Sequence, residues 1–234
     1  MTFWEHIDEL RKRLLYCFFS FILFSVIAYF FSDTIKNFLM NPVDAYVNEK
    51  SNLRTAFLAP HAPFFLYISI SIFSGIFFSF PVIIYNILNF IKPAVSKTRT
   101  ALFFIVLIFS IILFILGVTF TYAILIPISF KFLISFAGNE EMIFSINSIT
   151  SLILWSCFSI GLLFQLPIIA FFLAKIRLIT ADFLSKNRRY AILIAFILSA
   201  LITPPDVISQ IILVFPVILL YEACIFIVKR VQND

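Results

Sequence analysis

Charged residues are scarce in this chain of 234 residues, at 12% of the total, whereas soluble domains carry about 25%. Hydrophobic residues make up 62%, against roughly 45–50% in soluble domains. This composition argues against a soluble globular enzyme and against a disordered protein. Glycine is also rare, with 4 residues beside 33 phenylalanines, which argues against collagen-like, linker and phosphate-loop architectures.

Histidine and cysteine are too few and too widely spaced to form a common catalytic or metal centre. The two histidines, His6 and His61, lie outside the long hydrophobic runs, so an intramembrane serine protease would have no histidine at depth. The motif H-E-x-x-H and carboxylate clusters for divalent metals are also missing. Cys17, Cys157 and Cys224 lie in apolar runs without a C-x-x-C pair, which favours packing over disulfides or metal binding. We therefore expect no enzymatic activity, no cofactor and no metal.

Long runs without charge dominate what is present. Six such runs contain 19, 37, 31, 33, 16 and 15 residues in chain order. A helix needs about 20 apolar residues to cross the hydrocarbon core. No run alternates polar and apolar residues as the strands of a membrane β-barrel do. Because backbone groups in lipid must pair within the protein, the spans are predicted to be helices. The predicted spans are residues 14–31, 64–91, 101–128, 148–173, 190–202 and 207–228.

The last two predicted spans are short and lie back to back. The 13 residues of 190–202 rise only about 20 Å as a helix, against a hydrocarbon core of about 30 Å. The pair either crosses a locally thinned bilayer or forms a re-entrant hairpin, and we favour two short crossings. The predicted fold class is an all-α polytopic membrane protein with six transmembrane helices, forming one integral-membrane domain over residues 1–234.

Lysine and arginine are distributed unevenly among the segments that flank the predicted spans. Of the 17, 13 lie before the first span, in the second and fourth connecting segments, or in the C-terminal tail. Because cytoplasmic segments carry the excess of Lys and Arg, both termini are predicted to be cytoplasmic. The same rule accounts for the net charge of +5. Nucleic-acid binding is not expected, since no basic stretch has interleaved exposed aromatic residues.

Four prolines, Pro81, Pro127, Pro167 and Pro216, lie within or at the ends of predicted helices. Each removes a backbone hydrogen bond and tends to kink its helix. Several kinked helices predict a concave bundle. The alternative is the ordinary use of proline in membrane helices, where it is common.

Polar residues near the ends of the predicted spans are the candidate functional residues. Glu9 lies in a charged segment, His6–Leu14, which is either an amphipathic interfacial helix or a carboxylate site for a cationic partner. Gln165 is predicted to lie about 12 Å deep, where a buried amide normally bonds to another helix, so packing is favoured over ligand binding. Asp206 precedes a predicted helix and is a candidate N-cap. Glu222 lies in a span, and the sequence does not identify its partner.

Four segments of the chain, in this order, resemble the TatC family. They are His6–Leu14, Phe80–Tyr85, Thr203–Val207 and Tyr221–Glu222. The resemblance extends over nearly the whole chain. It implies the receptor subunit of the twin-arginine protein translocase, which binds twin-arginine signal peptides of folded proteins at the cytoplasmic face of the bacterial inner membrane. It also implies TatA-type and TatB-type single-span partners, self-association in a receptor complex, and transport driven by the proton-motive force.

The resemblance also implies a signal-peptide site. Glu9 matches an acidic residue that contributes to recognition of the arginine pair, and Arg11 and Phe90 match positions that matter for the receptor. Thr98 and Gln165 stand where the family often has acidic residues, and we expect both at the same site. The departure at Thr98 leaves the second arginine of the signal without an obvious carboxylate.

Other residues are expected to serve partner docking or the fold itself. Thr203 and Gln210 match a polar patch that the family uses to dock a partner helix. The residues with an expected structural role are Pro81, Pro167, Asp206 and Glu222.

A small secondary transporter of a low-molecular-weight solute is the competing function. It predicts a central polar cavity and solute flux by the purified protein alone. A translocase receptor predicts no solute flux and stable association with single-span partners. The chain has no internal repeat, which weakens the transporter interpretation.

Overall fold

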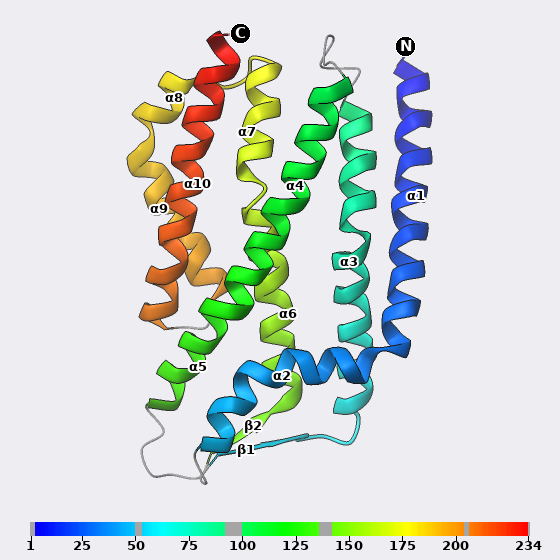
Figure 1. The fold of residues 1–234 in the computed structure, drawn as a ribbon, viewed down its shortest axis with the longest axis vertical. Helices are drawn as coiled ribbons and strands as arrows, with labels where there is room; N and C mark the ends of the chain where they lie inside the picture. The colour runs from blue at the N-terminus through cyan, green and yellow to red at the C-terminus, as the bar shows by residue number, and fades with distance from the viewer. Residues whose placement is uncertain (1–2, 50–52, 92–99, 136–141, 204–205, 234) are drawn as a thin grey trace.

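The computed structural model describes residues 3–49, 53–91, 100–135, 142–203 and 206–233, and nearly all of them are helical (Figure 1). The elements in chain order are α1 (Phe3–Phe30), α2 (Ser32–Glu49), β1 (Leu53–Ala56), α3 (Ala62–Ile91), α4 (Thr100–Phe120), η2 (Thr121–Leu125), α5 (Ile126–Ser135), β2 (Met142–Ser145), α6 (Ile146–Leu163), α7 (Leu166–Lys175), α8 (Ala181–Lys186), α9 (Arg188–Ile202) and α10 (Val207–Asn233). The predicted helical class is confirmed.

Five helical stretches in the described part of the chain are long and apolar enough to cross a membrane. They are Ile7–Phe30, Ala62–Ile91, Leu102–Ser135, Ile146–Lys175 and Val207–Gln232. The predicted span at 190–202 corresponds to α9, which has 15 residues and rises only about 22 Å. The count of six spans therefore stays a prediction.

Two of the long stretches are interrupted next to prolines. Pro127 follows the π-helical turn η2, and such a turn accommodates the backbone hydrogen bond that proline cannot make. A turn ending at Gln165 separates α6 from α7, and Pro167 lies in the first turn of α7, where its missing N–H has no helical acceptor to lose. Pro81 and Pro216 lie inside α3 and α10.

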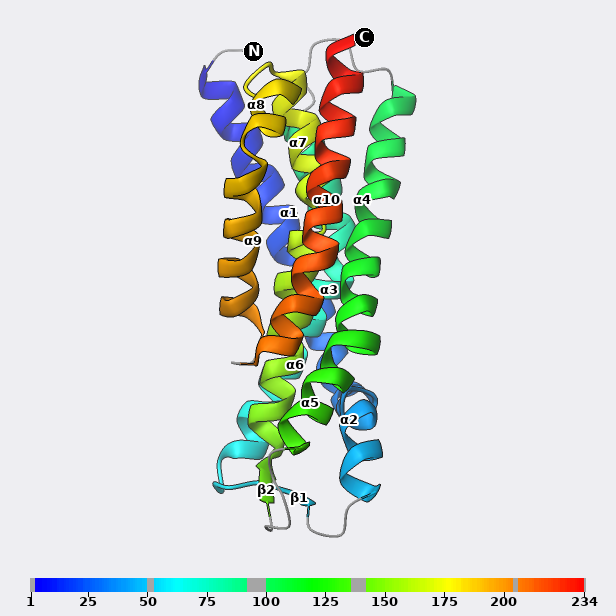
Figure 2. The ribbon, with the colours of Figure 1, turned by 90° about the vertical axis from the view of Figure 1, so that its left-hand side faces the viewer.

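The two ends of the molecule differ in character. The beginning of α1 and the end of α10 lie at the same end, as Figures 1 and 2 both show. We call it the terminal end. At the opposite end, α2 lies across the bundle, and β1 and β2 pair in parallel with Leu53 opposite Met142 and Ala56 opposite Ser145. An even number of crossings would place the termini on one side of the membrane, so this arrangement is compatible with the predicted orientation, which stays a prediction.

Helix α2 and strand β1 occupy a region, residues 32–63, for which the sequence predicts only a connecting segment. One face of α2 is apolar, and Leu39, Met40 and Val43 are buried in the core. A hydrogen bond of 2.8 Å from the Tyr67 hydroxyl to Asp33 Oδ1 ties the start of α2 to α3. Amphipathic burial, rather than a long apolar run, therefore holds this helix in place.

The hydrophobic core lies between α2, α3, α4, α6 and α10, with contributions from α5, η2 and α9. Its fully buried large residues include Leu66, Ile70, Leu125, Ile126, Ile153, Leu154, Ile160 and Leu213. Cys157 and Cys224 are buried, Cys17 is half-buried, and all three are free thiols.

Helix α1 stands at the edge of the bundle and packs mainly along α3 (Figure 1). In the most apolar 18-residue stretch of α1, only 6% of the residues are buried. The two helices approach closely at Gly75, because a Cβ atom there would overlap Ser25 Oγ and lie 2.9 Å from Ser25 Cα. The position of α1, and of the charged segment at its start, therefore depends on one helix–helix contact.

Candidate functional site

A cleft of about 710 Å³ lies between the first turns of α1 and the last turns of α3. We call it the α1–α3 cleft. Helix α1 contributes Glu9, Lys12, Arg13 and Tyr16 to its lining, and α3 contributes Val82, Tyr85, Asn86 and Asn89. Helical spacing explains both sets, since residues three, four and seven apart share one face of a helix.

Among the described residues that line the α1–α3 cleft, Glu9 is the only acidic one. Its Oε1 accepts hydrogen bonds from Nε of Arg13, at 3.0 Å, and from Nη2 of the same residue. Its Oε2 is buried and has no hydrogen-bond partner among the described residues. A carboxylate oxygen out of contact with water costs free energy unless a donor pairs with it, so a donor that reached Oε2 would stabilise the Glu9 carboxylate.

A second hollow, the α3–α7 groove, lies on the other side of α3. Its volume is about 810 Å³, and its lining from α3, α6 and α7 is apolar apart from Gln165. Phe90 and Ile91 of α3 line it near the end of that helix, and Ile169 and Phe172 line it from α7. The groove can hold an apolar chain segment, with one buried amide in its wall.

Helix α3 separates the two hollows. Val82 lines the cleft and Ile91 lines the groove, and nine residues at 100° each place them on opposite sides of the helix. Of the five residues expected at one signal-peptide site, Glu9 therefore lies in the cleft, whereas Phe90 and Gln165 line the groove. The Arg11 side chain is exposed and does not line the cleft, and Thr98 lies outside the described residues.

Gln165 lies at the break between α6 and α7 and is 6% exposed. Its Oε1 accepts a hydrogen bond from the Ser110 hydroxyl, and its Nε2 donates to the Ser110 carbonyl oxygen at 3.1 Å. The amide thus bonds across to α4, as expected for a polar group at membrane depth. A ligand in the groove would have to compete with Ser110 for this amide.

The residues expected to dock a partner helix lie near the turn between α9 and α10. Thr203 is buried, and its hydroxyl donates to the Ser199 carbonyl at 2.8 Å. Gln210 Nε2 donates to the Phe196 carbonyl at 3.1 Å and so links α10 to α9. Asp206 accepts a 2.7 Å hydrogen bond from the Ser209 N–H, which is the geometry of an N-cap for α10.

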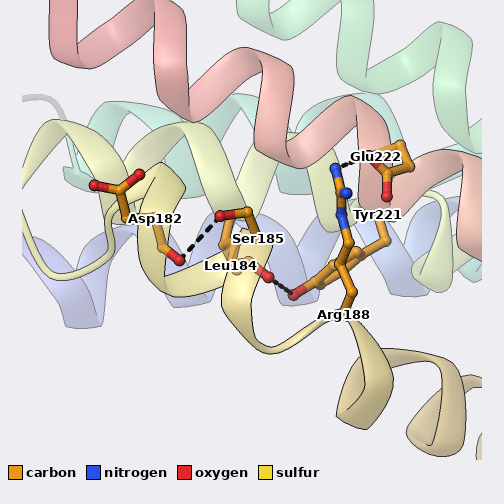
Figure 3. A network of polar contacts seen from close by, with 6 residues as sticks. All are labelled: Asp182, Leu184, Ser185, Arg188, Tyr221 and Glu222. Carbon is orange, nitrogen blue, oxygen red and sulfur yellow. Dashed lines mark hydrogen bonds and ion pairs between the residues drawn. The ribbon is translucent and has the colours of Figure 1, made fainter.

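Glu222 has a partner that the sequence does not reveal. Its Oε2 lies 2.8 Å from Nη2 of Arg188, at the start of α9, as Figure 3 shows. The neighbouring Tyr221 hydroxyl donates to the Leu184 carbonyl of α8 at 2.8 Å (Figure 3). Together these bonds attach α8 and the start of α9 to α10.

Several residues of these sites are not among those expected from the sequence. Tyr85, Asn86 and Asn89 are polar or amphipathic positions in an otherwise apolar run, and their spacing is the signal that could have marked a cleft-facing stripe. No comparable signal marks Ser110, which is one of many serines in apolar runs. No group of three His, Cys, Asp or Glu residues that could hold a metal ion is present in the part of the chain that the structure describes.

Comparisons with known proteins agree over nearly the full length of the chain. The profile of the family described as Sec-independent protein translocase protein (TatC) matches residues 5–216. A Sec-independent protein translocase protein TatC of Carboxydothermus hydrogenoformans is 34% identical over 99% of this chain and 94% of its own length. The corresponding protein of Aquifex aeolicus is 34% identical over 98% and 95% of the two chains.

A solved structure also matches. A crystal structure of a twin-arginine translocase receptor, TatC, superposes with a TM-score of 0.84 at 33% identity. The match covers 97% of this chain and 99% of the crystallised one.

Proposed function

Because this chain belongs to the TatC family of Sec-independent protein translocase proteins, we propose that it binds twin-arginine signal peptides of folded proteins, with the arginine pair at the α1–α3 cleft. The family resemblance inferred from the sequence is confirmed, and the chain is a multi-pass membrane protein of the twin-arginine translocase. The family consists of translocase components and is not a known enzyme family.

The unpaired oxygen of Glu9 is the observation that carries the proposal. A guanidinium group prefers planar, two-point contacts with a carboxylate. Glu9 has one oxygen in use by Arg13 and one buried oxygen without a partner among the described residues, so a two-point contact with a signal-peptide arginine requires Arg13 to release Glu9. Lys12 and Arg13 also line the cleft. If Glu9 were neutral, the charged side chains lining the cleft would all be positive, and the cleft would repel an arginine pair.

The tyrosines of the cleft support recognition of arginine over lysine. Tyr16 and Tyr85 line the cleft from opposite helices. A planar guanidinium stacks on aromatic rings, whereas an ammonium is a compact charge that makes no planar contact. A paired carboxylate and a stacked ring together therefore favour Arg-Arg over Lys-Lys signals.

The charge contact alone cannot account for stable binding. A half-exposed ion pair contributes about 0.2–1 kcal/mol, whereas a micromolar complex needs about 8 kcal/mol. We propose that the apolar stretch of the signal peptide lies in the α3–α7 groove and supplies most of the remainder by burial. Since α3 separates the cleft from the groove, the peptide would pass over the end of α3 near Ile91.

The remaining features of the function follow the same proposal. The protein lies in the bacterial inner membrane, and its terminal end faces the cytoplasm. The excess of Lys and Arg at the terminal end supports this orientation. TatA-type and TatB-type single-span subunits bind near Thr203 and Gln210, and the receptor self-associates. The proton-motive force drives transport. Since the side chains of Thr203 and Gln210 already bond to α9, a docking helix would have to compete for these bonds or contact the neighbouring exposed positions.

Photo-crosslinking of a signal peptide to the receptor in membranes tests the proposal. A photoreactive residue beside the arginine pair should crosslink to the receptor, and Glu9→Gln should reduce the yield to that of a Lys-Lys peptide. The matched control is Asp8→Asn, which removes the same charge from an exposed neighbour. If Glu9→Gln retains full Arg-Arg discrimination, or if Asp8→Asn abolishes it equally, Glu9 is not the recognition residue.

A further inference from the structure

A separate apolar pocket of about 230 Å³ lies between α9 and α10, with Leu166 of α7 also in its lining. It shares no lining residue with the cleft or the groove. Ile194 and Leu198 of α9 and Val217 and Ile218 of α10 are among its lining residues. The pocket lies on the outside of the bundle, because Ile194 is 54% exposed and α9 packs mainly against α10. In a membrane this seam would face lipid.

An arginine and its ion-pair partner line one end of this pocket. Arg188 lines it together with Glu222, and the two side chains are 52% and 45% exposed. Arginine has five N–H donors, and this ion pair uses one nitrogen, Nη2. Arg189 and Lys186 are exposed beside Arg188, and the Arg189 guanidinium lies 4.9 Å from the ring centre of Tyr190. The pocket mouth is thus lined by one ion pair, Arg188 with Glu222, and two more exposed cations lie close to Arg188 in the chain.

We propose that this pocket binds an anionic phospholipid, with part of an acyl chain between α9 and α10 and the phosphate at Arg188 and Arg189. An apolar cavity beside exposed cations at the end of a membrane helix matches both parts of such a lipid. A bound phosphate shares Arg188 with Glu222, so the carboxylate opposes lipid binding and the guanidinium favours it. This site takes no part in signal-peptide recognition, and the proposal holds whether or not the cleft binds arginine.

Quenching by brominated lipids measures the proposed preference on the full-length protein. A reporter variant carries Ile197→Trp at an exposed α9 position that does not line the pocket, with Trp4→Phe and Trp155→Phe removing the native tryptophans. The protein is reconstituted in bilayers of phosphatidylglycerol and phosphatidylcholine with identical chains, one lipid brominated at a time. Each nearby cation raises the affinity for an anionic headgroup about fivefold. The quenching data should therefore give a relative affinity for phosphatidylglycerol over phosphatidylcholine of at least about fivefold.

Two substitutions distinguish lipid binding from a structural role of the ion pair. Arg188→Gln should lower the ratio of phosphatidylglycerol to phosphatidylcholine affinity towards one. Glu222→Gln should raise this ratio. Both variants break the same ion pair, so a purely structural role would shift the preference in the same direction for both. Lys131→Gln, which removes an exposed cation at the opposite end, should leave the preference unchanged. A preference near one in the parent protein, or equal shifts in both variants, would overturn the proposal.

Discussion

Gly75 determines how closely α1 can approach α3, so Gly75→Ala should loosen the helix that carries Glu9. A Cβ atom at this position would overlap Ser25 Oγ and lie 2.9 Å from Ser25 Cα. The Cα atom belongs to the backbone of α1 and cannot move aside as a flexible side chain can. The two helices must therefore separate locally.

The magnitude follows from the cost of overpacking, which is about 1–3 kcal/mol for an added carbon in a closely packed contact. Ser25→Ala removes the nearest atom and should restore part of this loss in the double variant. Ser25→Ala alone should be nearly neutral, since Ser25 Oγ is buried without a hydrogen-bond partner among the described residues. The two substitutions are thus expected to be non-additive.

Unfolding in detergent micelles, followed by denaturant titration, would measure these free energies. Ser20→Ala is a suitable control, because Ser20 Oγ is another buried α1 hydroxyl without a partner in the described structure. Gly75→Ala should also reduce crosslinking of an Arg-Arg peptide at the cleft, with partial recovery in the double variant. A Gly75→Ala protein within about 0.3 kcal/mol of the parent, or strict additivity with Ser25→Ala, would refute the close-contact reasoning.

Three further predictions concern two other contacts and the orientation in the membrane. Ser110→Ala should cost about 0.6–1.7 kcal/mol of unfolding free energy, because Gln165 loses an interhelical hydrogen bond at membrane depth; no loss in the same micelle assay would mean that this bond contributes nothing. Asp206→Ala should cost about 1 kcal/mol by removing the N-cap of α10, and Asp206→Asn, which can still accept the bond, should retain most of the stability; equal losses in both variants would contradict a capping role. In a cysteine-free background, Asp8→Cys should react with an impermeant maleimide only in inside-out vesicles and Asn37→Cys only in intact cells; the reverse pattern would invert the proposed orientation.

The helical membrane architecture could be predicted because long apolar runs leave few alternatives. The ends of α3 and α10 lie within a few residues of the predicted spans. The interruption next to Pro167 also follows from local chemistry, since proline cannot donate the backbone hydrogen bond that a continuous helix requires.

The structure at the end opposite the termini could not be predicted in the same way. Helix α2 contains Pro42 and several polar residues, so its composition resembles that of a loop. Its apolar face is explained only by its packing against α3 and the core. The pairing of β1 with β2 joins segments almost ninety residues apart. Such contacts depend on tertiary packing, which neither segment encodes on its own.

The candidate sites were predicted in part. The sequence marks Glu9 as a carboxylate beside a span, but it cannot show that one oxygen lacks a partner in the described structure or that α3 separates Glu9 from Gln165. The partner of Glu222 is 34 residues away in the sequence. A charge pair between different helices leaves no periodic signal in a single sequence.

Binding of synthetic signal peptides to the purified receptor, measured as a double-mutant cycle, tests the central claim most directly. The cycle combines Glu9→Gln in the receptor with Arg-Arg→Lys-Lys in the peptide, and the four dissociation constants give the coupling free energy. The account predicts a coupling of up to about 1 kcal/mol, the contribution of a partly exposed ion pair. A coupling near zero would mean that Glu9→Gln weakens binding of the Arg-Arg and Lys-Lys peptides by the same factor. This result would contradict recognition of the arginine pair by Glu9.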